Sequence, residues 1–245
     1  MNIRDGIGKI ETQIDSFLMM GQSNMAGRGE FDEVDEIENK KCYMLRMGRW
    51  QTMSEPINPD RRIFGSEFHS GISLAASFAD SYARHYNKEV GLIPCADGGT
   101  KIVQWQPGGV LFDHAVMQAK LALRTSELKG VLWHQGESDC ISGEGFELYE
   151  ERLINVITGI RKELEKPDLV VVLGELSHDE ASNREKKISH DEFNRRLREI
   201  SKKISNTSVV SAKDLILKRD GLHFDSKSLR KLGIRYFEEY LKINR

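Results

Sequence analysis

The chain has 245 residues, of which 30% are charged and 39% hydrophobic, and its formal net charge is −2. This mixed and nearly neutral composition predicts a folded protein without a nucleic-acid-binding surface. No apolar run is long enough to span a bilayer, so no membrane partner is expected.

Apolar runs predict five strands, and amphipathic patterns predict helices between them. The predicted strands cover residues 15–20, 90–95, 130–133, 169–173 and 208–211. The predicted helices cover residues 70–87, 112–128, 146–164, 189–204 and 226–243, where apolar residues recur at three- and four-residue steps.

Residues 31–62 interrupt this alternation and are expected to form an insertion. Within them, residues 42–45 and 50–53 predict a short hairpin that turns near Gly48. No repeat and no Pro/Ser-rich linker divides the chain, so we expect one domain over residues 1–245.

Alternating strands and helices predict an α/β fold with three layers, α/β/α, in which helices cover both faces of a parallel sheet. Right-handed crossovers favour a five-stranded, flavodoxin-like sheet with strand order 2-1-3-4-5. Ligands of such open sheets bind beyond the carboxyl ends of the strands.

Small and polar residues follow the predicted strands. The exits read GQSN at 21–24, ADGGT at 96–100 and HQGESD at 134–139, and DGLH at 220–223 follows the fifth strand. Because parallel strands end at one edge of the sheet, these segments are expected to converge there.

Ser23 is the candidate nucleophile at this edge. Taken alone, Ser23 fits better as a residue that only caps the next helix. A serine needs a base within hydrogen-bond reach, and His223 can take up and return a proton near neutral pH. Asp220, three residues earlier, could fix the imidazole and stabilise its charged form, which predicts a Ser-Asp-His triad.

Acyl transfer also needs hydrogen-bond donors for the oxyanion. Backbone N–H groups of Ser23, Gly98 and Gly99 and the side-chain amide of Gln135 are the candidates. Gly98 and Gly99 could instead form a simple turn.

Further residues are expected near the same edge. Glu137 could replace Asp220 as the acid partner of His223, although a structural role for Glu137 is the preferred interpretation. Candidate residues that line the site are Gln22, Arg28, Glu67, Trp105 and Glu137.

The three cysteines share no CxxC spacing, and the seven histidines form no zinc-binding pattern. Free thiols are therefore expected, with no metal and no cofactor. The N-terminus lacks an apolar core of signal-peptide length, which predicts a cytoplasmic location.

The stretches GQSNMAG, GLIPCADGGT, WHQGESD and DGLHFD, in this order, resemble the SGNH-hydrolase superfamily. The most similar branch is the sialate O-acetylesterase-like group, which includes carbohydrate esterase family six, the acetylxylan esterases. The resemblance runs from about Phe17 to about Phe237. Gln135 stands where many members of the superfamily have asparagine, and GQSN replaces GDS; both departures are usual in the acetylesterase branch.

This resemblance implies a three-layer α/β/α fold and metal-free deacetylation of carbohydrate esters. By position it implies that Ser23 is the nucleophile, His223 the base and Asp220 the orienting acid. Gly99 (or Gly98) and Gln135 match the oxyanion-hole positions.

We therefore expect a serine esterase that acts on an acetylated sugar or oligosaccharide. The alternatives are an SGNH thioesterase or lysophospholipase, and a catalytically inactive carbohydrate-binding protein.

Overall fold

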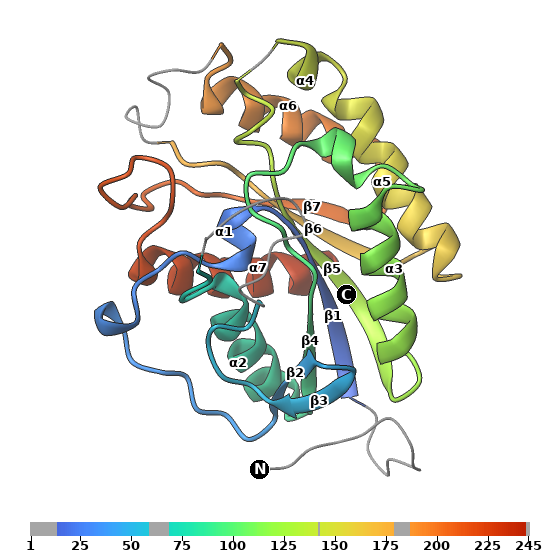
Figure 1. The fold of residues 1–245 in the computed structure, drawn as a ribbon, viewed down its shortest axis with the longest axis vertical. Helices are drawn as coiled ribbons and strands as arrows, with labels where there is room; N and C mark the ends of the chain where they lie inside the picture. The colour runs from blue at the N-terminus through green and yellow to red at the C-terminus, as the bar shows by residue number, and fades with distance from the viewer. Residues whose placement is uncertain (1–13, 59–68, 142, 179–186, 244–245) are drawn as a thin grey trace.

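Seven strands form one sheet in the part of the chain that this computed structural model describes, residues 14–58, 69–141, 143–178 and 187–243. In chain order they are β1 (Ile14–Gly21), β2 (Cys42–Arg46), β3 (Arg49–Thr52), β4 (Val90–Pro94), β5 (Ser126–His134), β6 (Val170–Gly174) and β7 (Thr207–Val210). Across the sheet their order is β3-β2-β4-β1-β5-β6-β7 (Figure 1).

The five predicted strands correspond to β4, β1, β5, β6 and β7, which pair in parallel. The predicted count of five is wrong. The hairpin β2-β3 is antiparallel within itself, but β2 also pairs in parallel with β4 through Cys42 to Met44. The hairpin therefore extends the sheet by two strands, because its backbone groups find partners along the free edge of β4.

Helices alternate with the strands along the chain. They are α1 (Ser23–Ala26), α2 (Leu74–Tyr86), α3 (Val110–Ala122), α4 (Gly143–Glu147), α5 (Tyr149–Glu163), α6 (His190–Lys203) and α7 (Ser226–Ile243), with 3-10 turns η1 (Phe31–Glu33) and η2 (Ile102–Trp105). The helix predicted over 112–128 ends earlier, at Ala122. Residues from Ser126 onward pair with β1 instead, beginning opposite Ile14.

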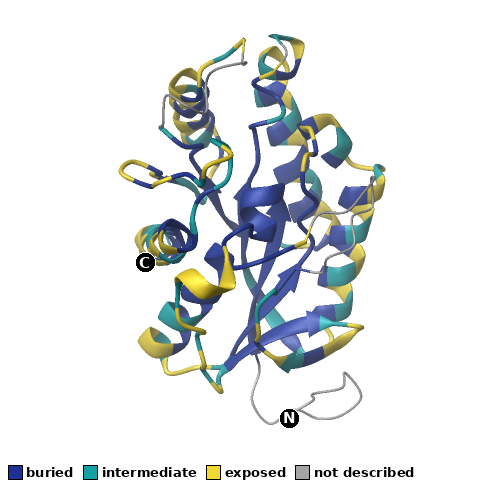
Figure 2. Cartoon of the chain, turned by 60° about the vertical axis from the view of Figure 1, so that its left-hand side comes forward, coloured by how far each residue is buried: buried dark blue, intermediate teal, exposed yellow. Residues whose placement is uncertain are grey.

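Two apolar clusters show that helices cover both faces of the sheet. Phe17 of β1 packs edge-on against Phe78 and Tyr82 of α2 and Tyr240 of α7, with ring centroids 4.7, 5.0 and 5.2 Å apart. Leu18, the next residue, belongs to the other cluster, with apolar residues of α3, α5 and α6. This alternation is what a strand buried on both faces requires, and Figure 2 shows the strands as the buried centre.

No helix among the described residues is both long enough and apolar enough to cross a membrane.

The candidate site lies at the carboxyl ends of β1 and β5, where Gly21 pairs with His134. The chain leaves β1 there and enters α1 within two residues.

Candidate active site

The exit of β1 places Ser23 at the edge of the sheet. Gly21 has φ +132°, and a Cβ atom there would lie 2.1 Å from the carbonyl oxygen of His134. Glycine is therefore required for β1 to turn so close to β5. The next N–H, of Gln22, donates to that same oxygen at 2.9 Å. Ser23 then begins α1 and is 5% exposed.

Ser23, His223 and Asp220 form a hydrogen-bonded chain. Nε2 of His223 lies 3.0 Å from Oγ of Ser23, and Nδ1 of His223 lies 2.8 Å from Oδ2 of Asp220. With the Nδ1 proton held by the carboxylate, Nε2 is free to accept the serine proton. The structure thus brings together the three residues expected to form the triad, from opposite ends of the chain.

The loop before α7 orients Asp220 through its own backbone. Oδ1 of Asp220 accepts hydrogen bonds from the N–H groups of Leu222 and His223, both at 2.9 Å. Partial burial alone would raise the pKa of Asp220. The backbone and ring N–H groups of His223 and the N–H of Leu222 outweigh this effect and lower the pKa of Asp220 below its usual range.

Asn24 joins this loop to the serine. Its Nδ2 donates to Oε1 of Glu137 at 2.7 Å and to the carbonyl of Leu222 at 3.3 Å. Its Oδ1 accepts from the N–H of Phe224 at 3.1 Å. The backbone groups on both sides of His223 are therefore bound by the residue next to Ser23. Asn24 was not among the residues expected to act at this edge of the sheet, although it lies within the GQSN stretch.

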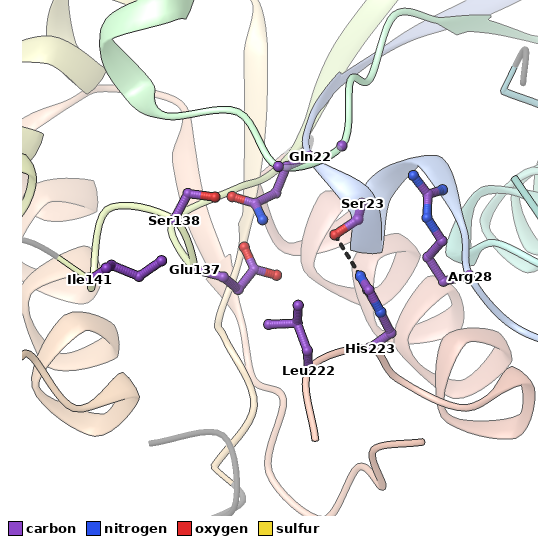
Figure 3. A pocket seen from close by; sticks show the side chains of 10 residues that line it. Gln22, Ser23, Arg28, Glu137, Ser138, Ile141, Leu222 and His223 are labelled. Carbon is purple, nitrogen blue, oxygen red and sulfur yellow. Dashed lines mark hydrogen bonds between the residues drawn. The ribbon is translucent and has the colours of Figure 1, made fainter. Parts of the chain in front are cut away.

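A cavity of about 280 Å³ opens at Ser23 and His223 (Figure 3). It is lined by Gln22, Ser23, Arg28, Gly98, Gly99, Glu137, Ser138, Ile141, Leu222 and His223. Seven of these were singled out from the sequence. Ser138, Ile141 and Leu222 were not; all three lie within or beside the HQGESD and DGLH stretches.

The cavity wall beside Ser23 leaves no room for a side chain at Gly98. A Cβ atom on Gly98 would lie 2.6 Å from Nη2 of Arg28 and 3.5 Å from Cβ of Ser23. Arg28 is 9% exposed, and its Nη1 donates to the carbonyl of Gly27 at 2.6 Å. Arg28 and Glu137 thus bring a guanidinium and a carboxyl group to the same cavity.

Gln135 lies elsewhere than expected. It is fully buried and does not line the cavity. Its Nε2 lies 2.6 Å from Oδ2 of Asp139, 2.9 Å from the carbonyl oxygen of Thr100 and 3.2 Å from Oε1 of Gln22, and its two hydrogens are donated within this group of acceptors. These acceptors take up the amide that was expected to face the oxyanion.

Trp105 is also placed differently from the expectation. It is fully buried, its ring packs edge-on against Trp133 at 5.5 Å, and its Nε1 donates to Oγ1 of Thr100 at 3.0 Å. Trp105 is therefore a core residue and cannot stack on a sugar in the cavity. Glu67, another expected lining residue, lies outside the described residues.

Two ionisable residues in the HQGESD stretch, His134 and Asp139, are fully buried and do not line the cavity. Burial lowers the pKa of His134, although the nearby Glu137 partly opposes this. Burial raises the pKa of Asp139, against hydrogen bonds from Gln135 and Ile102. Both shifts favour the neutral forms at this depth.

The three cysteine thiols are not available to this site. Cys42, Cys95 and Cys140 are free thiols, but all three are buried and none lines the cavity. Burial raises the pKa of Cys42 to about 12, which keeps it protonated at neutral pH. Among the described residues no group of three or more His, Cys, Asp or Glu side chains could hold a metal ion.

The chain is similar to known carbohydrate esterases. The model of the family described as "Carbohydrate esterase, sialic acid-specific acetylesterase" matches residues 13–242. A protein of Arabidopsis thaliana named "Probable carbohydrate esterase" is 29% identical over 244 residues, which cover 92% of this chain and 89% of that protein.

The chain is also similar to several solved structures. An Arabidopsis thaliana protein solved at 1.6 Å has a TM-score of 0.80 and 28% identity, covering 94% of this chain and 98% of its own. The structure of NanS has a TM-score of 0.73 at 13% identity, with 95% and 98% covered. A carbohydrate acetylesterase from Xanthomonas citri has a TM-score of 0.63 at 17% identity, covering 94% of this chain and 56% of its own. NanS and the Xanthomonas citri enzyme show that the fold is shared.

The resemblance to sialate O-acetylesterase-like SGNH hydrolases is confirmed by these comparisons. Since the family match covers nearly the whole chain, this protein belongs to the carbohydrate esterase family of sialic acid-specific acetylesterases, and it is a carboxylic ester hydrolase.

Proposed function

We propose that the protein removes acetyl groups from carbohydrate hydroxyls, with Ser23 as nucleophile, His223 as base and Asp220 as orienting acid. The observation that carries the proposal is the hydrogen-bonded chain from Asp220 through His223 to Ser23, at the mouth of a cavity. Membership of a carbohydrate esterase family supports the class of substrate.

The first half of the reaction forms an acyl-enzyme. Oγ of Ser23 adds to the ester carbonyl while Nε2 of His223 takes the hydroxyl proton. The bond to the sugar oxygen then breaks, and the imidazolium returns that proton to the leaving sugar hydroxyl. Asp220, with its lowered pKa, stays ionised and stabilises the imidazolium between the two transfers.

The second half repeats these steps with water. His223 takes a proton from water while the water oxygen adds to the acetyl carbonyl. The bond to Oγ of Ser23 then breaks, and His223 returns the proton to that oxygen. Acetate is the product. Backbone N–H groups of Ser23 and of Gly98 or Gly99 are the proposed donors to the oxyanion in both halves.

The small cavity supports a short acyl group. About 280 Å³ lies just below the range for small-molecule pockets, roughly 300–1,000 Å³. A long acyl chain would need many buried methylene contacts, each contributing about 0.8 kcal/mol. This observation weighs against the thioesterase and lysophospholipase alternatives. The esterase family weighs against an inactive binding protein.

Fluorophosphonate labelling followed by turnover on a panel of acetylated mono- and oligosaccharides tests the proposal. We expect labelling of the wild type at Ser23, no labelling of Ser23→Ala, and release of acetate from at least one acetylated sugar by the wild type alone. Acetate release by Ser23→Ala at the wild-type rate would contradict the proposal.

A further inference from the structure

The backbone groups of Ala96 lie just beyond the strand pairing of β4. The N–H groups of Cys95 and Asp97 donate to carbonyls of β1 at 3.0 and 2.9 Å, so the chain continues alongside β1 as far as Asp97. Backbone groups of successive residues in such a chain point to opposite sides, so those of Ala96 point away from β1, to the side where β2 pairs with β4. That pairing ends at Leu92, and Ala96 is 9% exposed. Its N–H and carbonyl therefore need a protein partner.

The side chain of Asn58 supplies that partner. Its Oδ1 accepts from the N–H of Ala96 at 3.2 Å, and its Nδ2 donates to the carbonyl of Ala96 at 3.0 Å. A backbone N–H can only donate and a carbonyl can only accept, so these two contacts fix which amide atom is which. Asn58 is 4% exposed. Its amide thus takes the place that the peptide group of a neighbouring strand would occupy.

The segment that carries Asn58 follows the hairpin β2-β3 and is fixed by Glu55. Oε1 of Glu55 accepts from the N–H of Ser73, directly before α2, at 2.9 Å. Oε2 of Glu55 lies 2.5 Å from Nη2 of Arg230 in α7, and both side chains are largely buried. Charge-assisted contacts of this kind are strong. The segment therefore presents Asn58 to the end of β4 from a support that is tied to α2 and α7.

The turn that follows Ala96 borders the cavity. Gly98 and Gly99 line the cavity, and a Cβ atom on Gly98 would lie 3.5 Å from Cβ of Ser23. The N–H groups of Gly98 and Gly99 are proposed donors to the oxyanion. Such donors act from about 2.7–3.1 Å, so a small shift of the turn separates them from the developing charge. The contacts that fix Ala96 therefore affect the position of these donors.

The far end of this turn is held by other contacts. Oγ1 of Thr100 donates to the carbonyl of Asp97 at 2.8 Å and accepts from Nε1 of Trp105 at 3.0 Å. Gly99, between Asp97 and Thr100, has φ +73°, a left-handed conformation that glycine adopts without strain. The turn is thus bounded by the Thr100 contacts at one end and by the Asn58 contacts at the other.

We propose that Asn58 is a positioning residue for catalysis: by binding both backbone groups of Ala96, it holds the N–H groups of Gly98 and Gly99 at the oxygen that becomes an oxyanion. This inference rests on the proposed serine esterase function. It also gives the segment after the hairpin a role at the active site, although none of its described residues lines the cavity.

Asn58→Asp and Asn58→Ser test the proposal. Asn58→Asp keeps an oxygen for the N–H of Ala96 but replaces the donor to the carbonyl of Ala96 by a second acceptor. Asn58→Ser removes both contacts and leaves space for a water molecule, so it is the milder change for folding. Asn194→Asp and Asn194→Ser are the matched controls, because Asn194 is also buried and binds both backbone groups of Leu176, at 2.8 and 2.9 Å, away from the cavity.

Each variant is assayed at pH 8 with p-nitrophenyl acetate and with its thiono analogue, in which a C=S group replaces the C=O group. Sulfur accepts hydrogen bonds weakly, so loss of the oxyanion donors slows the oxygen ester more than the sulfur ester. We expect kcat for the oxygen ester to fall by about 10²-fold in both Asn58 variants, with KM changed less than about threefold. The ratio of kcat/KM for the oxygen ester to that for the sulfur ester should fall about tenfold. Both Asn194 variants should keep the wild-type kcat and the wild-type ratio.

All rates are measured below the melting temperature of the least stable variant. Wild-type kcat in folded Asn58→Asp or Asn58→Ser would overturn the proposal. A lower kcat with an unchanged ratio of the two esters would also overturn it, because displacement of Ser23 or His223 slows both esters alike. An equal fall of the ratio in the Asn194 variants would have the same consequence. These results differ from failure of the proposed function, in which Ser23→Ala would hydrolyse p-nitrophenyl acetate as fast as the wild type.

Discussion

Asn24 and Glu137 are joined by a hydrogen bond of 2.7 Å from Nδ2 to Oε1. This contact fixes the amide of Asn24 so that its nitrogen also donates to Leu222 and its oxygen accepts from Phe224. The two loops that follow β5 and precede α7 are thereby tied to the turn that carries Ser23. The spacing between Ser23 and His223 depends on this three-way contact.

The first prediction follows from this contact. Asn24→Asp keeps the acceptor for Phe224 but loses both donated bonds and places a second carboxylate beside Glu137. We expect kcat to fall by about 10²-fold, because a misplacement on the order of 1 Å at a reacting group costs about that much. Steady-state kinetics and melting temperature are the measurements.

Asn194→Asp is the matched control for this prediction. Asn194 is also buried, accepts from the N–H of Leu176 at 2.8 Å and donates to its carbonyl at 2.9 Å, and does not line the cavity. Both variants should lower the melting temperature, but Asn194→Asp should keep kcat. Equal kcat values in the two variants would show that Asn24 has a structural role alone.

The second prediction concerns the acid partner of His223. Asp220→Asn should lower kcat by about 10⁴-fold, as loss of the triad acid does in serine proteases. Glu137→Gln should be much milder, since an amide oxygen can still accept from Asn24. Both variants are compared in one assay, and a larger loss in Glu137→Gln would transfer the acid role to Glu137.

The third prediction is a pH dependence. His223 must be neutral to accept the serine proton, so kcat/KM should rise with pH as the imidazole loses its proton and then reach a plateau. Hydrogen bonds outweigh burial and lower the pKa of Asp220, so its carboxylate stays ionised throughout this rise. The acid limb should therefore have a slope of one in log kcat/KM against pH. A slope of two, or a rate that does not change between acidic and neutral pH when chemistry is rate-limiting, would contradict this assignment.

The fourth prediction concerns acyl-chain length. The cavity of about 280 Å³ is bordered by Gly98, Gly99 and Ser23, and its larger apolar side chains are Ile141 and Leu222. We expect p-nitrophenyl acetate to be hydrolysed well, butyrate much more slowly and octanoate not at all. Rates across this series are the measurement. Faster turnover of octanoyl or lysophospholipid substrates than of acetylated sugars would favour the lipase-like alternative.

Much of the central fold could be predicted from local pattern. The parallel strands β1, β4, β5, β6 and β7 are short apolar runs, and the helices between them have clear amphipathic periods, which are properties of neighbouring residues. The edge hairpin could be located near Gly48, but its membership of the sheet could not. That depends on pairing between Cys42–Met44 and β4, in which Cys42 lies opposite Val90, 48 residues away along the chain.

The candidate site, too, could be predicted only in part from the sequence. The residue types of Ser23, Asp220 and His223, with the rule that parallel strands end at one edge, were sufficient to predict that these residues meet. The tertiary structure decided which neighbouring polar side chain faces the cavity. Gln135 and Gln22 both follow strand ends, but Thr100 and Asp139 hold the Gln135 amide in the core, whereas Gln22 is turned toward the cavity. Such orientations depend on hydrogen-bond partners that are distant in sequence, and no local pattern of residues records them.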